Sequence, residues 1–224
     1  MAIEGVGGFP LILLAGGKSE RMGTPKGLLA VHGESFLQYQ ARRFQEAGGQ
    51  ALVVVLGYGA ALYEKALAGL QAVVNPTPER GPFSSLQCGL TWLAREQPAM
   101  SGCFVLPIDV PAPDASVWKR LTAELAAGTE VVCPEYAGSG GHPVLLSPAF
   151  CALLRRVPTD DPAARLDRQI AALPAGKRCR ALVSDAQVTM NLNTPGSFAA
   201  WCRYLESSRV SGFVESEPRE GETE

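Results

Sequence analysis

The stretch Leu11-Ile-Leu-Leu-Ala-Gly16-Gly17-Lys-Ser-Glu-Arg21-Met-Gly-Thr-Pro-Lys26 decides the fold. Its apolar start is typical of a buried strand, and the glycine pair is typical of a loop at the strand's carboxyl end. Backbone N–H groups at glycines can approach a phosphate chain closely, and Arg21 and Lys26 can neutralise its charge. The spacing matches neither the Gly-x-x-x-x-Gly-Lys-Ser/Thr phosphate loop nor the Gly-x-Gly-x-x-Gly dinucleotide fingerprint. We therefore expect a phosphate-binding loop of another kind.

Short apolar runs alternate with longer segments of helical spacing along the rest of the chain. The predicted strands are Pro10–Ala15, Ala51–Leu56, Ala72–Val74, Cys103–Leu106, Val131–Cys133, Pro143–Leu146 and Ala181–Val183. The predicted helices include Ser35–Ala47, Ala60–Ala68, Ser84–Ala94 and Asp114–Ala126, the last with Asp114 as its cap. This alternation predicts an α/β fold, a mostly parallel sheet covered by helices on both faces.

The domain organisation follows from the same pattern. We expect a single domain over residues 1–206, because no linker or internal repeat divides the chain. The segment 207–224 is polar and acidic and is predicted to be disordered. In such sheets ligands lie at the carboxyl ends of the strands, so the loops after Ala15, Val74 and Leu106 should carry the chemistry.

The composition restricts the class of partner. The chain has 224 residues, 46% of them hydrophobic, and a formal net charge of −2. This charge gives no broad basic surface, so we expect a small substrate and no nucleic acid. No stretch approaches the roughly 20 apolar residues that span a membrane. The six cysteines form no Cys-x-x-Cys pair, and free thiols in the cytoplasm are the simplest interpretation.

The loop after the third predicted strand begins Asn75-Pro-Thr-Pro-Glu-Arg-Gly-Pro-Phe-Ser84-Ser85. Ser84 or Ser85 could cap the helix that follows, and the positive end of that helix would face the ligand. Asn75 has the donor and the acceptor needed to read a base edge, although Asn before Pro is also an ordinary turn pair. We expect Asn75, Ser84 and Ser85 on the ligand side of the site.

Asp109 ends the predicted strand Cys103–Leu106 in the motif Leu106-Pro-Ile-Asp109-Val-Pro. Mg²⁺ prefers one or two carboxylates together with phosphate oxygens and water, so a single well-held Asp suits it. Asp109 is therefore the first predicted metal ligand, and the alternative is a turn-forming Asp ahead of Pro111. A further motif, Asn191-Leu-Asn193-Thr-Pro, follows the strand-like Val188-Thr-Met, and Thr194-Pro195 there is typical of a helix start.

These motifs together resemble the nucleotidyltransferase superfamily that makes nucleotide sugars, and most closely its molybdenum cofactor guanylyl- and cytidylyltransferase branch. The resemblance covers about Leu11 to Trp201 and implies one Rossmann-like αβα domain. It implies a nucleotide site that includes Leu14, Ala15, Gly16, Gly17, Arg21 and Lys26. It also implies a second metal-binding oxygen from Asn193, although the cytidylyl branch typically has Asp there, so that metal affinity would depend on the nucleotide.

The segment Gly140-Gly-His142-Pro resembles the acceptor side of the cytidylyl branch, and the two glycines suggest close approach of a ligand. A satisfied structural histidine is the equal alternative. The resemblance implies a Mg²⁺-dependent transfer from GTP or CTP to a phosphorylated small molecule, most closely molybdopterin, with Lys26, Arg21 and Asp109 catalytic. It also admits a transient contact with a molybdoenzyme or its maturation factor. A sugar 1-phosphate acceptor and a catalytically silent binding protein remain alternatives, and the residues do not decide between GTP and CTP.

Overall fold

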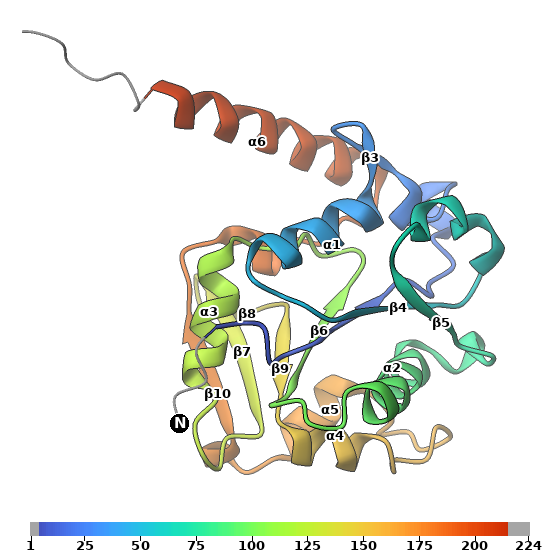
Figure 1. Cartoon of the computed structure of the whole chain (residues 1–224), viewed down its shortest axis with the longest axis vertical. Helices are drawn as coiled ribbons and strands as arrows, with labels where there is room; N and C mark the ends of the chain where they lie inside the picture. Colours follow the sequence, from blue (N-terminus) through green and yellow to red (C-terminus); the bar gives the residue numbers. More distant parts are fainter. Residues whose placement is uncertain (1–4, 215–224) are drawn as a thin grey trace, which may run out of the picture.

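The computed structural model describes residues 5–214, with side chains up to Ser207, around a central sheet (Figure 1). In spatial order its strands are β10 (Arg178–Leu182), β7 (Val131–Tyr136), β9 (Val144–Leu146), β6 (Cys103–Pro107), β1 (Leu11–Leu14), β4 (Leu52–Leu56) and β5 (Gln71–Val74). β9 runs antiparallel to β6 and β7, as does the short β8 (Ser139–Gly140) to β7, and the other pairs are parallel. The predicted mostly parallel sheet is confirmed.

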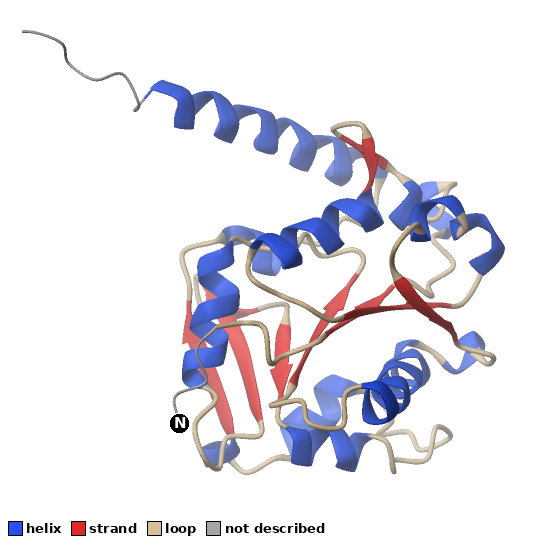
Figure 2. Ribbon diagram, viewed as in Figure 1, coloured by secondary structure: helices blue, strands red, loops and turns tan. Residues whose placement is uncertain are grey.

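Helices cover both faces of this sheet (Figure 2). They are α1 (Phe36–Glu46), α2 (Pro82–Glu96), α3 (Ala115–Glu124), α4 (Pro148–Leu154), α5 (Leu166–Ala172) and α6 (Pro195–Val214). α1, α3 and α6 lie on one side of the sheet, and α2, α4 and α5 lie on the other (Figure 1). This is the expected αβα sandwich.

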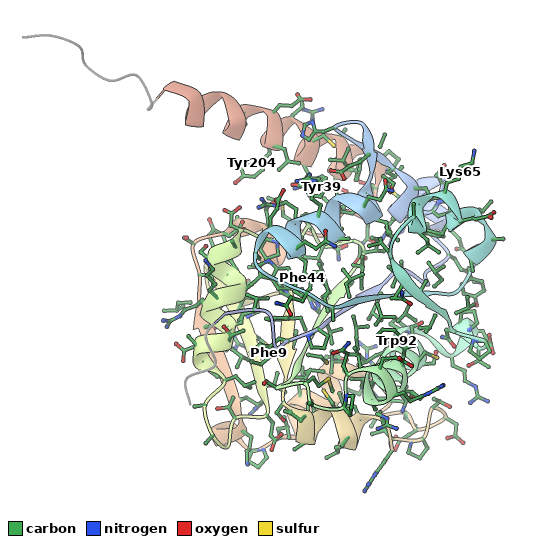
Figure 3. The ribbon with its side chains drawn as sticks, in the orientation of Figure 1. Phe9, Tyr39, Phe44, Lys65, Trp92 and Tyr204 are labelled. Carbon is green, nitrogen blue, oxygen red and sulfur yellow. The ribbon has the colours of Figure 1, made fainter. Side chains whose placement is uncertain are left out.

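The core is divided into two layers by the alternation of side chains along the strands. On β1, Leu13 packs with the α1 layer, whereas Ile12 packs with the α2 layer, because successive side chains point to opposite faces. Phe9 and Phe44 lie in the α1 layer (Figure 3), and their rings are 6.0 and 6.2 Å from that of Phe104. Both layers are needed because β1 is buried between two sets of helices.

Two predicted elements are wrong in type. The predicted helix over 60–68 is two 3₁₀ turns, Ala60–Tyr63 and Lys65–Leu67, which follow Gly59 in the left-handed region at φ 68°. The strand-like Val188-Thr-Met belongs to a 3₁₀ turn, Ala186–Thr189, which Asp185 begins by accepting a hydrogen bond from the backbone N of Gln187 at 2.9 Å. In both places a turn competes successfully with a short apolar pattern. β8, α4, α5 and the hairpin of β2 (Ala30–Val31) and β3 (Glu34–Ser35) were not predicted from the sequence.

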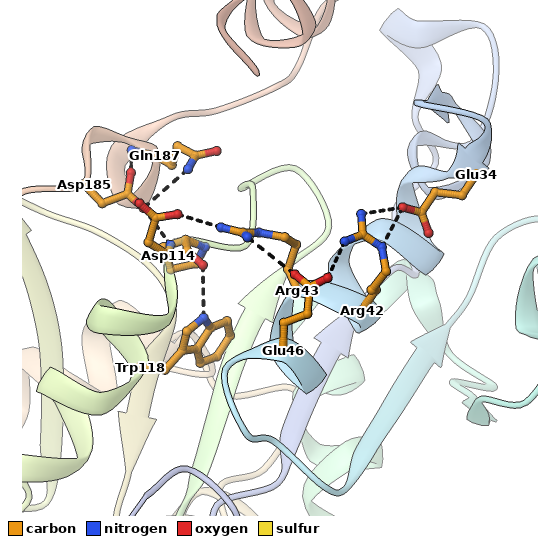
Figure 4. Close-up of polar contacts among 9 residues, drawn as sticks. Glu34, Arg42, Arg43, Glu46, Asp114, Trp118, Asp185 and Gln187 are labelled. Atoms are coloured by element: carbon orange, nitrogen blue, oxygen red, sulfur yellow. Dashed lines mark hydrogen bonds and ion pairs between the residues drawn. The ribbon is translucent and has the colours of Figure 1, made fainter. Parts of the chain in front are cut away.

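Asp114 precedes α3 as predicted, but its side chain does not cap that helix. Its carboxylate accepts a hydrogen bond from Arg43 of α1 at 2.6 Å, and its backbone N donates to Asp185 at 2.8 Å (Figure 4). The guanidinium lies close enough for a charge-assisted bond, which replaces the local cap. Asp114 therefore joins α1, α3 and the turn near residue 186.

α6 begins beside α1 and extends away from the sheet (Figure 1). Trp201 is buried, and its ring lies 5.1 Å from that of Phe36 of α1. The helix continues to Val214, past the boundary predicted at 207, and residues 215–224 of the predicted disordered tail lie outside the described residues. Among residues 5–214, no helix has both the length and the apolar character that a membrane crossing requires.

Candidate active site

The glycine loop after β1 carries two glycines with different surroundings. Gly16 is packed against the loop after β4, where a Cβ on Gly57 would stand only 2.6 Å from the Gly16 carbonyl oxygen. Gly17 faces open space, because a Cβ there would meet none of the described atoms within 4 Å. The loop closes on itself through Ser19, whose hydroxyl accepts a hydrogen bond from the backbone N of Lys26 at 3.2 Å. Gly16 thus fixes the loop, and Gly17 leaves its backbone open to a ligand.

A hollow of about 330 Å³ lies against this loop. Its lining residues are Lys18, Ser19, Glu20, Arg21, Met22, Lys26 and Asn193. Arg21 and Lys18 are exposed, and Lys18 also forms an ion pair with Glu20 at 3.5 Å. Three cationic side chains therefore border one hollow beside open glycine backbone, an arrangement that suits a chain of phosphates.

The ammonium of Lys26 lies between two predicted metal ligands. Its Nζ is 3.1 Å from Oδ2 of Asp109 and also donates a hydrogen bond to Oδ1 of Asn193. The Lys26 and Asp109 side chains are 12% and 27% exposed, so the pair is partly buried. Asp109 and Asn193 thus converge on one point, as the sequence analysis expected, and that point holds the Lys26 cation.

Backbone contacts and two further side chains position this cluster. The backbone N of Leu192 donates to the carbonyl of Asp109 at 2.7 Å, which brings the neighbouring Asn193 to the end of β6. Asn191 accepts a hydrogen bond from the Asn193 amide nitrogen, so the amide oxygen faces Lys26. The buried Gln40 of α1 donates to Val110 and accepts from Ala112, both at 2.6 Å. The exit from β6 is therefore held rigidly.

Asn75 forms a second polar cluster at the end of β5. Its amide nitrogen donates to the hydroxyls of Ser84 and Ser85 at 2.8 and 3.0 Å, and its oxygen accepts from the backbone N of Thr77 at 2.9 Å. α2 begins at Pro82 after Gly81, so neither serine is its cap, and that prediction is wrong. Ser84 instead donates to the Gly81 carbonyl at 2.8 Å.

His142 lies between β8 and β9, as part of a second hollow of about 600 Å³ that Leu14 and Pro107 also line. Its Nδ1 is buried and has no hydrogen-bond partner among the described residues. Burial lowers the pKa of His142, although a backbone contact with Val105 and the charge of Asp109 oppose this shift. Gly141 does not leave room for a ligand, since a Cβ there would stand 2.2 Å from the Val188 carbonyl oxygen. At Gly141 the close approach is therefore to backbone, whereas a Cβ on Gly140 would meet none of the described atoms within 4 Å.

Other residues of the site escaped the sequence analysis. Tyr58 follows β4, its backbone N donates to the Gly16 carbonyl at 3.2 Å, and Lys18 Nζ lies 5.1 Å from its ring centroid. The signal was Gly57-Tyr-Gly59 directly after an apolar run, but no charged residue marked it. Gln40 carried no local signal at all, whereas Asn191 stood in the quoted motif Asn191-Leu-Asn193 and was given no role of its own. The predicted helix start at Thr194 is confirmed, because its hydroxyl accepts from the backbone N of Ser197 at 3.1 Å.

Comparison with known proteins gives one consistent result. The sequence profile of the MobA-like NTP transferase domain matches residues 11–175. A molybdenum cofactor guanylyltransferase of Rhodopseudomonas palustris (strain HaA2) is 30% identical over 199 residues, 85% of this chain and 89% of that protein. Another, of Rhizobium meliloti (strain 1021), is 29% identical over 136 residues, 60% of this chain and 61% of that protein, which is less than two thirds of its length.

Solved structures are similar over most of the chain. The crystal structure of Rv0371c from Mycobacterium tuberculosis H37Rv superimposes with a TM-score of 0.73 at 25% identity, covering 87% of this chain and 98% of that one. The complex of the same protein with manganese gives a TM-score of 0.67 at 22% identity, with the same coverage. These likenesses support the αβα fold described above.

Proposed function

Since the chain belongs to the family of MobA-like NTP transferase domains, we propose that it transfers a nucleoside monophosphate from GTP to molybdopterin and releases pyrophosphate. The observation that carries the proposal is the convergence of Lys26, Asp109 and Asn193 beside the open backbone of Gly17. Cationic, anionic and amide groups meet there at the carboxyl end of a parallel sheet, where such folds bind nucleotides.

The glycine loop and its cations would hold the triphosphate. The backbone at Gly16 and Gly17 supplies N–H donors, and Arg21 and Lys26 border the same hollow. Lys26 balances the negative charge that gathers on pyrophosphate as it leaves. Leu14 is the last residue of β1 and Ala15 follows it, so both would lie beside the nucleotide. Asn75, Ser84 and Ser85 would support the loop on the base side.

Asp109 and Asn193 would hold a divalent metal ion. The donor set fits, because one carboxylate and one amide oxygen meet at one point and both are hard oxygen ligands. We propose Mg²⁺, and the manganese complex of the mycobacterial protein supports a divalent ion in this fold. When bound, the ion would supply Lewis-acid stabilisation of the phosphate oxygens. The low charge of this ligand pair makes metal affinity depend on the phosphates.

The transfer step needs no nucleophile from the protein. An ionised phosphate oxygen of the acceptor forms a bond to the α-phosphorus, and the bond from that phosphorus to the bridging oxygen of the β-phosphate breaks. The electron pair leaves with pyrophosphate beside Lys26. The task of the residues is therefore to align two anions and to balance their charge, which is the work that Arg21, Lys26 and Asp109 would do.

The acceptor would enter through the hollow that His142 lines. The apolar side chains of Phe83, Leu86 and Ile170 form its walls, and Arg80 and Arg165 lie at its border. Apolar walls favour a flat ring over a polyhydroxylated sugar, which needs many hydrogen-bond partners. This supports molybdopterin over a sugar 1-phosphate. Its lowered pKa would keep His142 neutral at pH 7, so that its imidazole can bond the ring without adding charge.

Guanine as the base is supported by the names of the relatives in Rhodopseudomonas palustris and Rhizobium meliloti. A transient contact with a molybdoenzyme would follow from the product, which must pass to an enzyme that uses it. No described side chain reads a base edge unambiguously, so the base is decided by experiment.

The proposal is tested by pyrophosphate release. GTP, CTP, ATP and UTP are each offered with molybdopterin or with a sugar 1-phosphate, in the presence of Mg²⁺. We expect release with GTP and molybdopterin. Release only with a sugar 1-phosphate would show that the acceptor is a sugar phosphate and not molybdopterin. Release with CTP and not with GTP would show that the base is cytosine. Nucleotide binding without pyrophosphate release from any pair would support a catalytically silent binding protein.

A further inference from the structure

Lys26 has a partner already in this structure. Its ammonium bonds the oxygens of Asp109 and Asn193, which are the groups that the proposed function assigns to the metal ion. Asn191 accepts a hydrogen bond from the Asn193 amide nitrogen, so the Asn193 amide oxygen faces Lys26. Gln40 donates a hydrogen bond to the carbonyl of Val110, which holds the loop that carries Asp109 after β6. The two oxygens are therefore held in place around a monovalent cation that belongs to the protein.

A divalent ion and the Lys26 ammonium cannot share this position. Both need the same oxygens, and two cations a few ångströms apart in a partly buried site repel each other strongly. Asp109 is not among the described residues that line the hollow by the glycine loop, whereas Lys26 and Asn193 are. An ion that enters from this hollow therefore meets Lys26 before it meets the carboxylate.

A triphosphate offers Lys26 a second partner in the same hollow. Arg21, Lys18 and Lys26 itself border it, so a rotation of the Lys26 side chain would take its ammonium from Asp109 to a phosphate oxygen in that hollow. This exchange keeps the ammonium paired throughout and frees Asp109 at the moment when phosphate oxygens arrive. Those oxygens can complete the coordination of a metal ion that two protein oxygens alone hold weakly.

We propose that Lys26 is an internal counter-ion that excludes divalent metal from Asp109 and Asn193 until a triphosphate draws it away, so that metal and nucleotide enter together. This rests on the proposed function, because it takes Asp109 as a metal ligand. Lys26 then acts twice, as a positioning residue before the nucleotide binds and as a phosphate ligand afterwards. Without nucleotide the site does not collect metal ions.

The test measures Mn²⁺ binding to the nucleotide-free protein, and the electron spin resonance signal of free Mn²⁺ is the readout. Lys26→Gln removes the competing charge, so we expect Mn²⁺ to bind at least about tenfold more tightly than to the wild type. Arg21→Gln is the matched control, because it removes one positive charge from the same loop. Among the described residues Arg21 forms no hydrogen bond or ion pair with Asp109, so the Mn²⁺ affinity of this variant should stay close to that of the wild type. The double variant Lys26→Gln, Asp109→Asn should lose the gain.

A second readout guards against a misfolded variant. Mn²⁺ without nucleotide should raise the thermal unfolding temperature of Lys26→Gln and leave that of the wild type unchanged. Equal Mn²⁺ affinities of wild type and Lys26→Gln, with both folded, would overturn the counter-ion role. Pyrophosphate release by the wild type is measured in parallel, so that an active enzyme with unchanged Mn²⁺ affinity overturns the counter-ion alone and not the proposed function.

Discussion

Two polar clusters lie at the same edge of the sheet and behave differently. The cluster of Lys26, Asp109 and Asn193 is charged and partly exposed, and its cation lies beside the hollow at the glycine loop. The cluster of Asn75, Ser84 and Ser85 is neutral and at most 5% exposed, and its hydrogen bonds are made within the protein. Breaking the hydrogen bonds of the second cluster would leave buried polar groups unpaired, which raises the free energy of the folded protein. Under the proposed function, a polar residue at a strand end therefore takes part in chemistry in the first cluster and supports the fold in the second.

The largest expected effect comes from removing the anion of the first cluster. Asp109→Ala should lower the rate of pyrophosphate release by at least about a hundredfold. The variant lacks a proposed ligand of the metal ion, and that ion would stabilise the charge of the transition state. The unfolding temperature should change little, since the carboxylate contacts Lys26 and not the apolar core. Steady-state kinetics at saturating Mg²⁺ and thermal denaturation check both parts. Activity near that of the wild type would remove Asp109 from the site.

The opposite pattern is expected for the second cluster. Asn75→Ala removes the partner of two buried hydroxyls, and the free energy of unfolding should fall by about 2 kcal/mol. Urea denaturation measures this loss, and the Michaelis constant for GTP should stay close to that of the wild type. Ser85→Ala is the control, with a smaller loss because it removes one bond. A large rise in that Michaelis constant at unchanged stability would instead make Asn75 a base contact.

The smallest effect is expected from adding a second carboxylate to the first cluster. Asn193→Asp places a second carboxylate against the proposed metal ion, but it also strengthens the hold on Lys26. These effects oppose each other, so the Mg²⁺ concentration for half-maximal rate should fall by only about threefold. A Mg²⁺ titration of the rate measures it. At saturating GTP, where Lys26 is proposed to contact phosphate and no longer opposes the metal ion, an unchanged Mg²⁺ dependence would give Asn193 a purely structural role.

The architecture and the edge of the sheet that carries the site could both be predicted from the sequence. Apolar runs such as Leu11–Leu14 and the glycine pair after them are local patterns, and local patterns predict strands and loops well. The parallel order then places the loops after β1 and β6 side by side. For the same reason Lys26 and Asp109 were expected in one site, and the family resemblance added Asn193 as a second metal ligand. The segment 60–68, where turn residues outweigh a short apolar pattern, was not predicted correctly.

Only the tertiary structure decided which polar groups are bonded to one another. Lys26 and Asp109 are separated by 83 positions, and their pairing depends on how the loops after two strands close, which no local pattern encodes. In the same way Asn75 turned inward to two serines, and the glycine at 141 proved to make room for the backbone of Val188. Hydrogen-bond partners are chosen by distance and direction across the folded chain, whereas the preference of a residue for a strand, a loop or a turn is already present in its neighbours.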